Sequence, residues 1–219
     1  MAPHPYVPED LELPGYHPQV VGYELLLGVF FSGCLIVGLA TWWAAGAIWK
    51  LGTGDKLVCC WLIISGLTHM VVEGPVVVFG DFYKSSSGNV VMEIWKEYCK
   101  ADSRYCTRDA CTIVMEFLTA FGEGPGCVLA AYGIVKRSSW RHMAAILVVV
   151  CELYGDVLYL GTSWFDDFKW NRPELLYFWG YFIAVNSIWI VVPLLVILHQ
   201  GRGIMAAVAQ FDRSQAKED

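Results

Sequence analysis

Five long apolar stretches, separated by polar links, dominate the pattern of the chain. They run over residues 23–49, 57–79, 110–135, 143–163 and 176–199. A helix rises about 1.5 Å per residue, so each stretch is long enough to cross the roughly 30 Å hydrocarbon core of a bilayer. The pattern therefore predicts an all-α, polytopic membrane protein with five transmembrane helices.

Polar side chains recur at helical spacing in four of these stretches. Residues three, four or seven positions apart share one face of a helix, so each set falls on one side. The sets are Trp61, Ser65, His69 and Glu73 in the second stretch, Thr112, Glu116, Thr119 and Glu123 in the third, Glu152, Asp156, Tyr159 and Ser163 in the fourth, and Trp179, Phe182, Asn186, Trp189 and Pro193 in the fifth. Ionisable groups in hydrocarbon are costly, so we expect these faces to turn inward around a cavity.

The first stretch carries no comparable polar stripe. We expect it to be a packing helix, in which Gly28, Ser32, Gly33 and Gly38 allow a neighbouring helix to approach closely.

Depth in the membrane groups the polar residues further. Counted inward from the side opposite the C-terminus, Glu73, Glu116 and Asp156 lie roughly 9–11 Å deep, at about 1.5 Å per residue. By the same count His69 and Asn186 lie roughly 15 Å deep, and Glu152 lies at nearly that depth. The predicted bundle thus gathers polar groups from four helices in one half of the membrane.

The chemistry of this layer suggests proton transfer. His69 and Glu73 are one helical turn apart, and a buried carboxyl beside an imidazole can share or relay a proton. The faces of Trp179 and Trp189 can stabilise a carbocation through the ring quadrupole. Acid, base and cation stabiliser are the groups that a proton shift on a lipophilic substrate needs, and no cofactor is expected.

Composition and charge agree with this reading. Hydrophobic residues make up 56% of the chain and charged residues 16%, and a net charge of −6 without a basic run argues against nucleic acid. No cleavable signal peptide is expected, because the first twenty residues hold no Lys or Arg. The Lys and Arg bias of the short links places the C-terminus in the cytoplasm. The expected division is an N-terminal lumenal segment 1–22, a membrane domain 23–200 and a cytoplasmic tail 201–219.

Other chemistries find less support. His69 and Glu73 would supply two metal ligands, but no Cys/His cluster supplies the rest, so no metal site is expected. The Gly-Glu-Gly-Pro-Gly run 122–126 predicts a kink rather than a phosphate loop. In the link 80–109, Cys99 and Cys106 are spaced to allow a disulfide if that link faces an oxidising lumen, but spacing alone does not fix a pairing.

Six motifs in series resemble the emopamil-binding protein family, the sterol Δ8-Δ7 isomerases of the endoplasmic reticulum. They are His4-Pro-Tyr, His69-x-x-x-Glu73-Gly, Trp95-Lys-Glu-Tyr98-x-Lys-x-Asp102-Ser-Arg-Tyr105, Met115-Glu116-x-x-Thr119, Tyr154-Gly-Asp156-Val-Leu-Tyr, and Tyr177-Phe-Trp179 followed by Asn186-x-x-Trp189. Each motif alone is weak, but together they cover most of the chain over about 57–200.

The resemblance implies a five-helix fold around a lipid-accessible sterol pocket. It implies an enzyme that moves the ring double bond from C8=C9 to C7=C8, by protonation at C9, a cation at C8 and deprotonation at C7. His69 and Glu73 would donate the first proton. Glu116 would face the cation and, with Thr119 and Asn186, remove or hold the second proton, while Trp189 would offer its ring to the cation.

The resemblance also implies further contacts and partners. The residues expected to contact substrate are Thr119, Tyr98, Asp102, Tyr105, Trp179 and Asp156. Cationic amphiphilic amines that imitate the cation would bind, and the tendency of family members to dimerise allows a homodimer. Glu123 and Glu152 have no role in the family pattern.

Two other classes stay open at this stage. A relative of the same superfamily, the sigma-2 receptor, binds sterols and amines without isomerase activity and shares the acidic pocket; His69 beside Glu73 and the Asn186-x-x-Trp189 element favour the isomerase. A proton-coupled transporter would be expected to show repeats or paired broken helices, and the sequence offers only the Gly-Pro kink.

Overall fold

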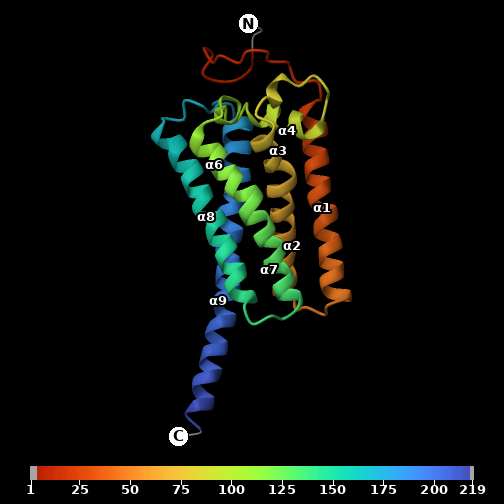
Figure 1. Ribbon diagram of the computed structural model, residues 1–219, viewed down its shortest axis with the longest axis vertical. Coiled ribbons are helices and arrows are strands. Elements are labelled where there is room, and N and C mark those ends of the chain that lie inside the picture. The colour runs from red at the N-terminus through yellow and green to blue at the C-terminus, as the bar shows by residue number, and fades with distance from the viewer. Residues whose placement is uncertain (1–3, 218–219) are drawn as a thin grey trace.

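The computed structural model describes residues 4–217, and it contains helices but no strand within that range. Five helical segments are long and apolar enough to cross a membrane, which confirms the fold predicted from the apolar pattern (Figure 1). The first is α1 (Tyr23–Ala47), the second is α2 (Thr53–Leu67) with η1 (Thr68–Glu73) and α3 (Gly74–Val78), the third is α6 (Ala110–Leu118) with η3 (Thr119–Glu123) and α7 (Gly124–Val135), the fourth is α8 (Arg141–Phe165), and the fifth is η4 (Leu176–Val185) with α9 (Asn186–Gln215).

The second and third membrane helices are each interrupted by a wide π-helical turn, η1 and η3. Both turns end at a Gly-Pro pair, Gly74-Pro75 and Gly124-Pro125, where the proline lacks the N–H that a regular α-helix would use. Such turns are common at functional sites. The run 122–126, expected to form a kink, thus spans the end of η3 and the start of α7, and the second helix carries a matching π-helical turn.

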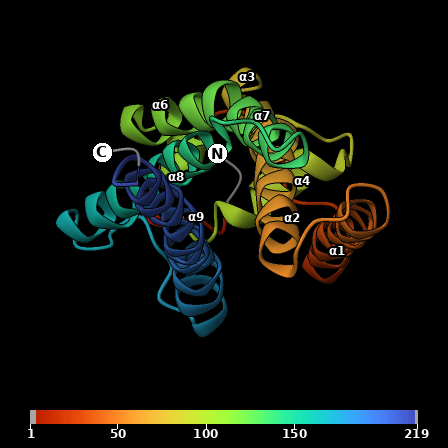
Figure 2. The same cartoon turned by 90° about the horizontal axis from the view of Figure 1, so that it is seen from below.

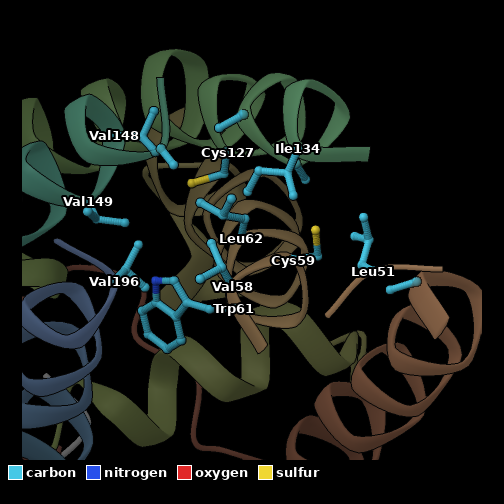
Figure 3. Packing of buried hydrophobic residues seen from close by; sticks show 14 residues of the cluster. Leu51, Val58, Cys59, Trp61, Leu62, Cys127, Ile134, Val148, Val149 and Val196 are labelled. Atoms are coloured by element: carbon cyan, nitrogen blue, oxygen red, sulfur yellow. The ribbon is translucent and has the colours of Figure 1, made fainter. Parts of the chain in front are cut away.

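Close packing brings the two π-helical turns together. A Cβ placed on Gly66 would lie 2.9 Å from the carbonyl oxygen of Gly124, so only glycine lets α2 and α7 approach this closely. Below the turns, Val58 and Leu62 of α2 pack against Cys127 and Ile134 of α7 and against α8 (Figure 3). This apolar cluster fixes the rotation of the helices whose polar faces meet above it.

α1 lies at the edge of the bundle, where it packs mainly against α2 and α4 (Figure 2). The expectation that its small residues allow close packing is wrong for Gly28 and Gly33, because a Cβ at either position would meet nothing within 4 Å in the described structure. Gly38, by contrast, faces a neighbour, with its Cβ position 3.3 Å from Ile64.

The link 80–109 folds into a cap over one end of the bundle. It contains η2 (Phe82–Lys84), α4 (Val90–Tyr98) and α5 (Arg104–Thr107). Inside the cap Lys96 Nζ donates to Glu93 Oε1 at 2.8 Å, and both side chains are fully buried. The same Glu93 carboxyl accepts the backbone N–H groups of Val20 and Val21.

Besides the link 80–109, the N-terminal segment and the link after α8 contribute to this cap. The N-terminal segment contributes Tyr6 and Leu13 to its apolar core, and Ser103 donates a hydrogen bond to the carbonyl of Val7. From the link after α8, the Asn171 amide donates to the carbonyl of Ala101 at 2.9 Å. The cap therefore ties the N-terminus to both links on its side of the bundle (Figure 1).

Two sequence expectations concern segments that the structure describes in more detail. Cys99 and Cys106 are buried in the cap, but they are free thiols, as are the other six cysteines, all of which lie within the described range. The segment after residue 200, expected as a tail, continues α9 as one helix to Gln215, beyond the bundle (Figure 1).

Candidate functional site

A cavity with mostly apolar walls lies between the helices, beneath the cap. All five membrane helices and α4 contribute to its lining. Its polar lining groups are Thr68, His69, Glu73, Glu97, Glu116, Thr119, Glu123, Glu152, Asp156 and Asn186, together with the hydroxyls of Tyr98, Tyr105, Tyr159 and Tyr181 and the indole of Trp189. Each of the four polar faces thus turns residues into this cavity, as expected from their cost in lipid, although Trp179 of the fifth stretch does not follow.

The His69–Glu73 pair is formed, and it lies on the π-helical turn η1. His69 Nδ1 is 2.6 Å from Glu73 Oε2, and the His69 side chain is 4% exposed while Glu73 keeps 17% exposed. Thr119 Oγ1 donates to the same Glu73 oxygen at 2.7 Å and lies 3.0 Å from the carbonyl oxygen of Glu116. Thr119 therefore bridges the second and third helices at the two π-helical turns.

Glu116 reaches the cavity from α6 and is bound on one side only. The Tyr105 hydroxyl donates to Glu116 Oε1 at 2.6 Å, whereas Oε2 is buried without a hydrogen-bond partner among residues 4–217. Burial raises the pKa of the Tyr105 phenol well above its ordinary value, so this hydroxyl stays protonated and acts as a donor. Glu116 thus has one oxygen held in place by Tyr105 and one oxygen without a hydrogen bond.

Asn186 reaches the cavity from the start of α9. Its amide donates to the Tyr98 hydroxyl at 2.8 Å and to the carbonyl of Phe182 at 2.7 Å. The Tyr98 hydroxyl in turn lies 3.3 Å from that of Tyr159, and burial raises the pKa of Tyr98. Asp156 of α8 lines the same cavity, and its buried Oδ2 has no hydrogen-bond partner within the described structure.

Trp189 faces the cavity beside the acid pair. Its ring centroid lies 6.3 Å from that of His69 and 5.4 Å from that of Trp61, which it meets edge to face. The indole N–H donates to Ser65 Oγ at 3.0 Å. The ring is therefore held in one orientation, with its position fixed from behind.

Behind His69 lies a hydrogen-bonded group that the sequence did not predict. Ser65 Oγ lies 3.0 Å from His69 Nε2 and donates to Glu152 Oε1 at 2.6 Å. The sequence placed Ser65 on the His69 face and Glu152 at nearly the same depth, but depth alone does not give the rotation of one helix against another.

Two residues expected to contact substrate do not line the cavity. Asp102 is buried in the cap, where its carboxylate is bound by the guanidinium of Arg104, with Nη2 2.6 Å from Oδ2. Trp179 lies on the outside of η4 and is 58% exposed. Its expected face assumed an α-helical period, and the wider π-helical turns of η4 (Leu176–Val185) rotate it away from Asn186.

The remaining predicted residues are together. His69, Glu73, Glu116, Asn186 and Trp189, proposed to be catalytic, all line one cavity. Thr119, Tyr98, Tyr105 and Asp156 line it as well. Within the described range, no three His, Cys, Asp or Glu residues come together in an arrangement that could hold a metal ion.

Comparison with known proteins connects this cavity to a family. The sequence profile described as EBP: EXPERA (EXPanded EBP superfamily) matches residues 90–200. The chain is 37% identical to a probable 3-beta-hydroxysteroid-Delta(8),Delta(7)-isomerase of rice (Oryza sativa subsp. japonica), over 94% of each chain. It is 33% identical to protoglabretal synthase of Ailanthus altissima, over 99% of each chain. It is 32% identical to the 3-beta-hydroxysteroid-Delta(8),Delta(7)-isomerase of rat (Rattus norvegicus), over 98% of this chain and 94% of the rat protein. Together, the profile and the nearly full-length identity show that this chain belongs to the EBP family, within the expanded EBP superfamily.

Proposed function

We propose that this protein is a membrane enzyme that isomerises sterols, moving the ring double bond from C8=C9 to C7=C8. The observation that carries the proposal is that the His69–Glu73 pair and Glu116 line the same mostly apolar cavity. One carboxyl oxygen of Glu116 is buried there without a hydrogen bond in the described structure. The names of the rice and rat relatives support the same activity.

In the first step the His69–Glu73 pair delivers a proton to C9. The 2.6 Å contact allows the proton to pass between Nδ1 and Oε2, and Glu73 lines the cavity and keeps part of its side chain accessible. Thr119 holds the same carboxyl from the third helix, so its orientation is set before substrate arrives. We assign Glu73 as the acid that protonates C9 and His69 as the group that supplies the proton to Glu73.

Protonation at C9 leaves a tertiary cation at C8, which the cavity is suited to stabilise. Trp189 lines the cavity and would offer its ring to the cation, and Glu116 in its carboxylate form would place a negative charge in a site whose walls are mostly apolar. Because Tyr105 occupies Glu116 Oε1, the unpartnered Oε2 is the atom that can take the proton from C7. The proton gained at C9 and the proton lost at C7 balance, so the reaction needs no redox partner.

The substrate would reach this cavity from the lipid. One side of the cavity is lined by α1, through Leu26, Leu27, Phe30 and Phe31. Because α1 packs mainly against α2 and α4, its contact with the fifth helix is slight. We expect a flat, apolar sterol to enter between α1 and η4. Cationic amphiphilic amines would bind at Glu73 and Glu116 as mimics of the C8 cation. The expected location is the endoplasmic reticulum membrane, with the N-terminus and the cap in the lumen.

A direct assay tests the proposal. Purified protein in detergent is given a Δ8-sterol without added nucleotide or metal, and the product is analysed by gas chromatography with mass spectrometry. The Δ7 isomer is expected, and Glu73→Gln is expected to form none while remaining monodisperse. Sterol binding without conversion would overturn the enzyme assignment and leave a sterol- and amine-binding protein resembling the sigma-2 receptor.

A further inference from the structure

Ser65 is the centre of a buried hydrogen-bond cluster behind the acid pair. Its Oγ lies 3.0 Å from His69 Nε2, donates to Glu152 Oε1 at 2.6 Å and accepts the Trp189 indole N–H at 3.0 Å. Ser65 itself is fully buried. The cluster therefore joins the second, fourth and fifth membrane helices on the side of His69 that faces away from Glu73.

Glu152 is the acceptor at the end of this cluster. Besides the Ser65 hydroxyl, it receives the Trp61 indole N–H on Oε2 at 3.0 Å and the Cys127 thiol on Oε1 at 3.4 Å. Its side chain is fully buried. A buried carboxyl surrounded by donors is satisfied as an acceptor-only carboxylate, so Glu152 fixes the direction in which the Ser65 hydroxyl points.

The hydrogen inventory of Ser65 then determines the form of His69. A hydroxyl has one hydrogen and two lone pairs. The hydrogen of Ser65 is directed to Glu152, and one lone pair accepts from Trp189. The other lone pair faces His69 Nε2, so Nε2 must carry a hydrogen and donate it. The remaining proton of the pair is the one between His69 Nδ1 and Glu73 Oε2.

We propose that Ser65 and Glu152 are positioning residues that hold His69 with its hydrogen on Nε2 and so confine the transferable proton to the contact with Glu73. The arrangement resembles the way in which a buried carboxylate orients the histidine of a hydrolase triad, here with a serine hydroxyl between carboxylate and imidazole. Its catalytic meaning rests on the proposed isomerase function, whereas the hydrogen arrangement itself does not.

The same carboxylate also fixes the aromatic wall. Trp189 is anchored by its N–H on Ser65, and Trp61, which donates to Glu152, packs edge to face against the Trp189 ring. Glu152 Oε1 lies 3.6 Å from His69 Nε2, so its negative charge favours the imidazolium that forms whenever both ring nitrogens carry hydrogen. One side chain without a place in the family pattern thus holds the group that supplies the proton and the ring that faces the cation.

The experiment combines kinetics with spectroscopy of the histidine ring. In protein labelled with ¹⁵N at histidine, the resonance lost in His69→Gln should show a hydrogen on Nε2. In Ser65→Ala and Glu152→Gln, kcat for the Δ8-sterol should fall roughly 10- to 100-fold, the range that a lost coupling between contacting residues gives, while KM changes little. The double variant should lose about as much as the worse single variant, because the two residues act as one unit.

Ser163→Ala is the matched control. Ser163 is a fully buried serine on α8 whose hydroxyl donates to the Asn171 side chain, and it does not line the cavity. Its kcat should equal that of the unmodified protein. A bare Nε2 on His69, an unchanged kcat in Ser65→Ala, or an equal loss in Ser163→Ala would overturn the inference. A hydrogen on Nε2 in a protein that converts no sterol would instead uphold the positioning and refute the isomerase function.

Discussion

Replacing Tyr105 by phenylalanine tests whether Glu116 works as the base. The Tyr105 hydroxyl donates to Glu116 Oε1 at 2.6 Å, and Glu116 Oε2 has no partner in the described part of the chain. Both residues are almost completely buried, at 4% and 8% exposure. Tyr105→Phe therefore leaves the carboxyl without a donor and changes little else, because the ring and its packing remain.

The expected loss of kcat in Tyr105→Phe follows from the strength of this one hydrogen bond. A hydrogen bond to a charged group contributes about 1.5–3 kcal/mol, and a factor of ten in rate corresponds to about 1.4 kcal/mol. A carboxylate that must be negative opposite the C8 cation should lose most of that stabilisation, so kcat should fall roughly 10- to 100-fold. KM should change little, since the lost contact does not touch the substrate.

Steady-state turnover of a Δ8-sterol in detergent measures this, with Tyr83→Phe as the control. Tyr83 is also a buried tyrosine, but it belongs to the cap and does not line the cavity. An unchanged kcat in Tyr105→Phe, alongside an inactive Glu116→Gln, would refute the reasoning that the donated hydrogen bond is what makes Glu116 effective.

Three further predictions concern the proton, the cap and the helix contact. In deuterated water the product should carry deuterium at C9, measured by mass spectrometry and NMR; its absence would exclude protonation from an exchangeable group. Burial opposes ionisation of Glu93, but hydrogen bonds from Lys96, Val20 and Val21 outweigh it and lower the pKa of Glu93 below its ordinary 4.5. The ionised Glu93 therefore stabilises the fold fully above pH 4.5, and this stabilisation is lost as the pH falls through the lowered pKa of the folded protein. Glu93→Gln cannot lose it, so its melting temperature in detergent should fall less steeply in acid than that of the unmodified protein. Gly66→Ala should lower the free energy of unfolding by about 1–3 kcal/mol, because its Cβ would meet the Gly124 carbonyl at 2.9 Å, whereas Gly28→Ala, with nothing within 4 Å, should not.

The sequence predicted the five membrane helices because apolar length is a direct physical requirement of a bilayer. Face and depth counting also brought His69, Glu73, Glu116 and Asn186 to one cavity, since the cost of charge in lipid leaves only the interior for them.

The errors have identifiable physical causes. Trp179 was assigned to the wrong face because η4 departs from the α-helical period on which the counting relied. Asp102 was assigned to the substrate although its partner, Arg104, stands two residues away in the same motif. The Ser65–Glu152 contact crosses between α2 and α8, and its formation depends on their rotation, which the packing of Leu62 in the apolar cluster with α8 sets.

The cap has a consequence for the order in which the protein assembles. Its buried ion pairs and apolar core need the N-terminal segment, the link 80–109 and the link that follows α8, as the contacts of Glu93, Ser103 and Asn171 show. The last of these pieces reaches its side of the membrane only after four helices have been inserted. Tyr98 and Tyr105, which bind Asn186 and Glu116, are parts of the cap. During synthesis, the carboxyls of the cavity, such as Glu73 and Glu116, are therefore in the membrane before the cap is complete. A mutation in the link after α8 could thus abolish activity by preventing assembly, without changing any residue of the cavity.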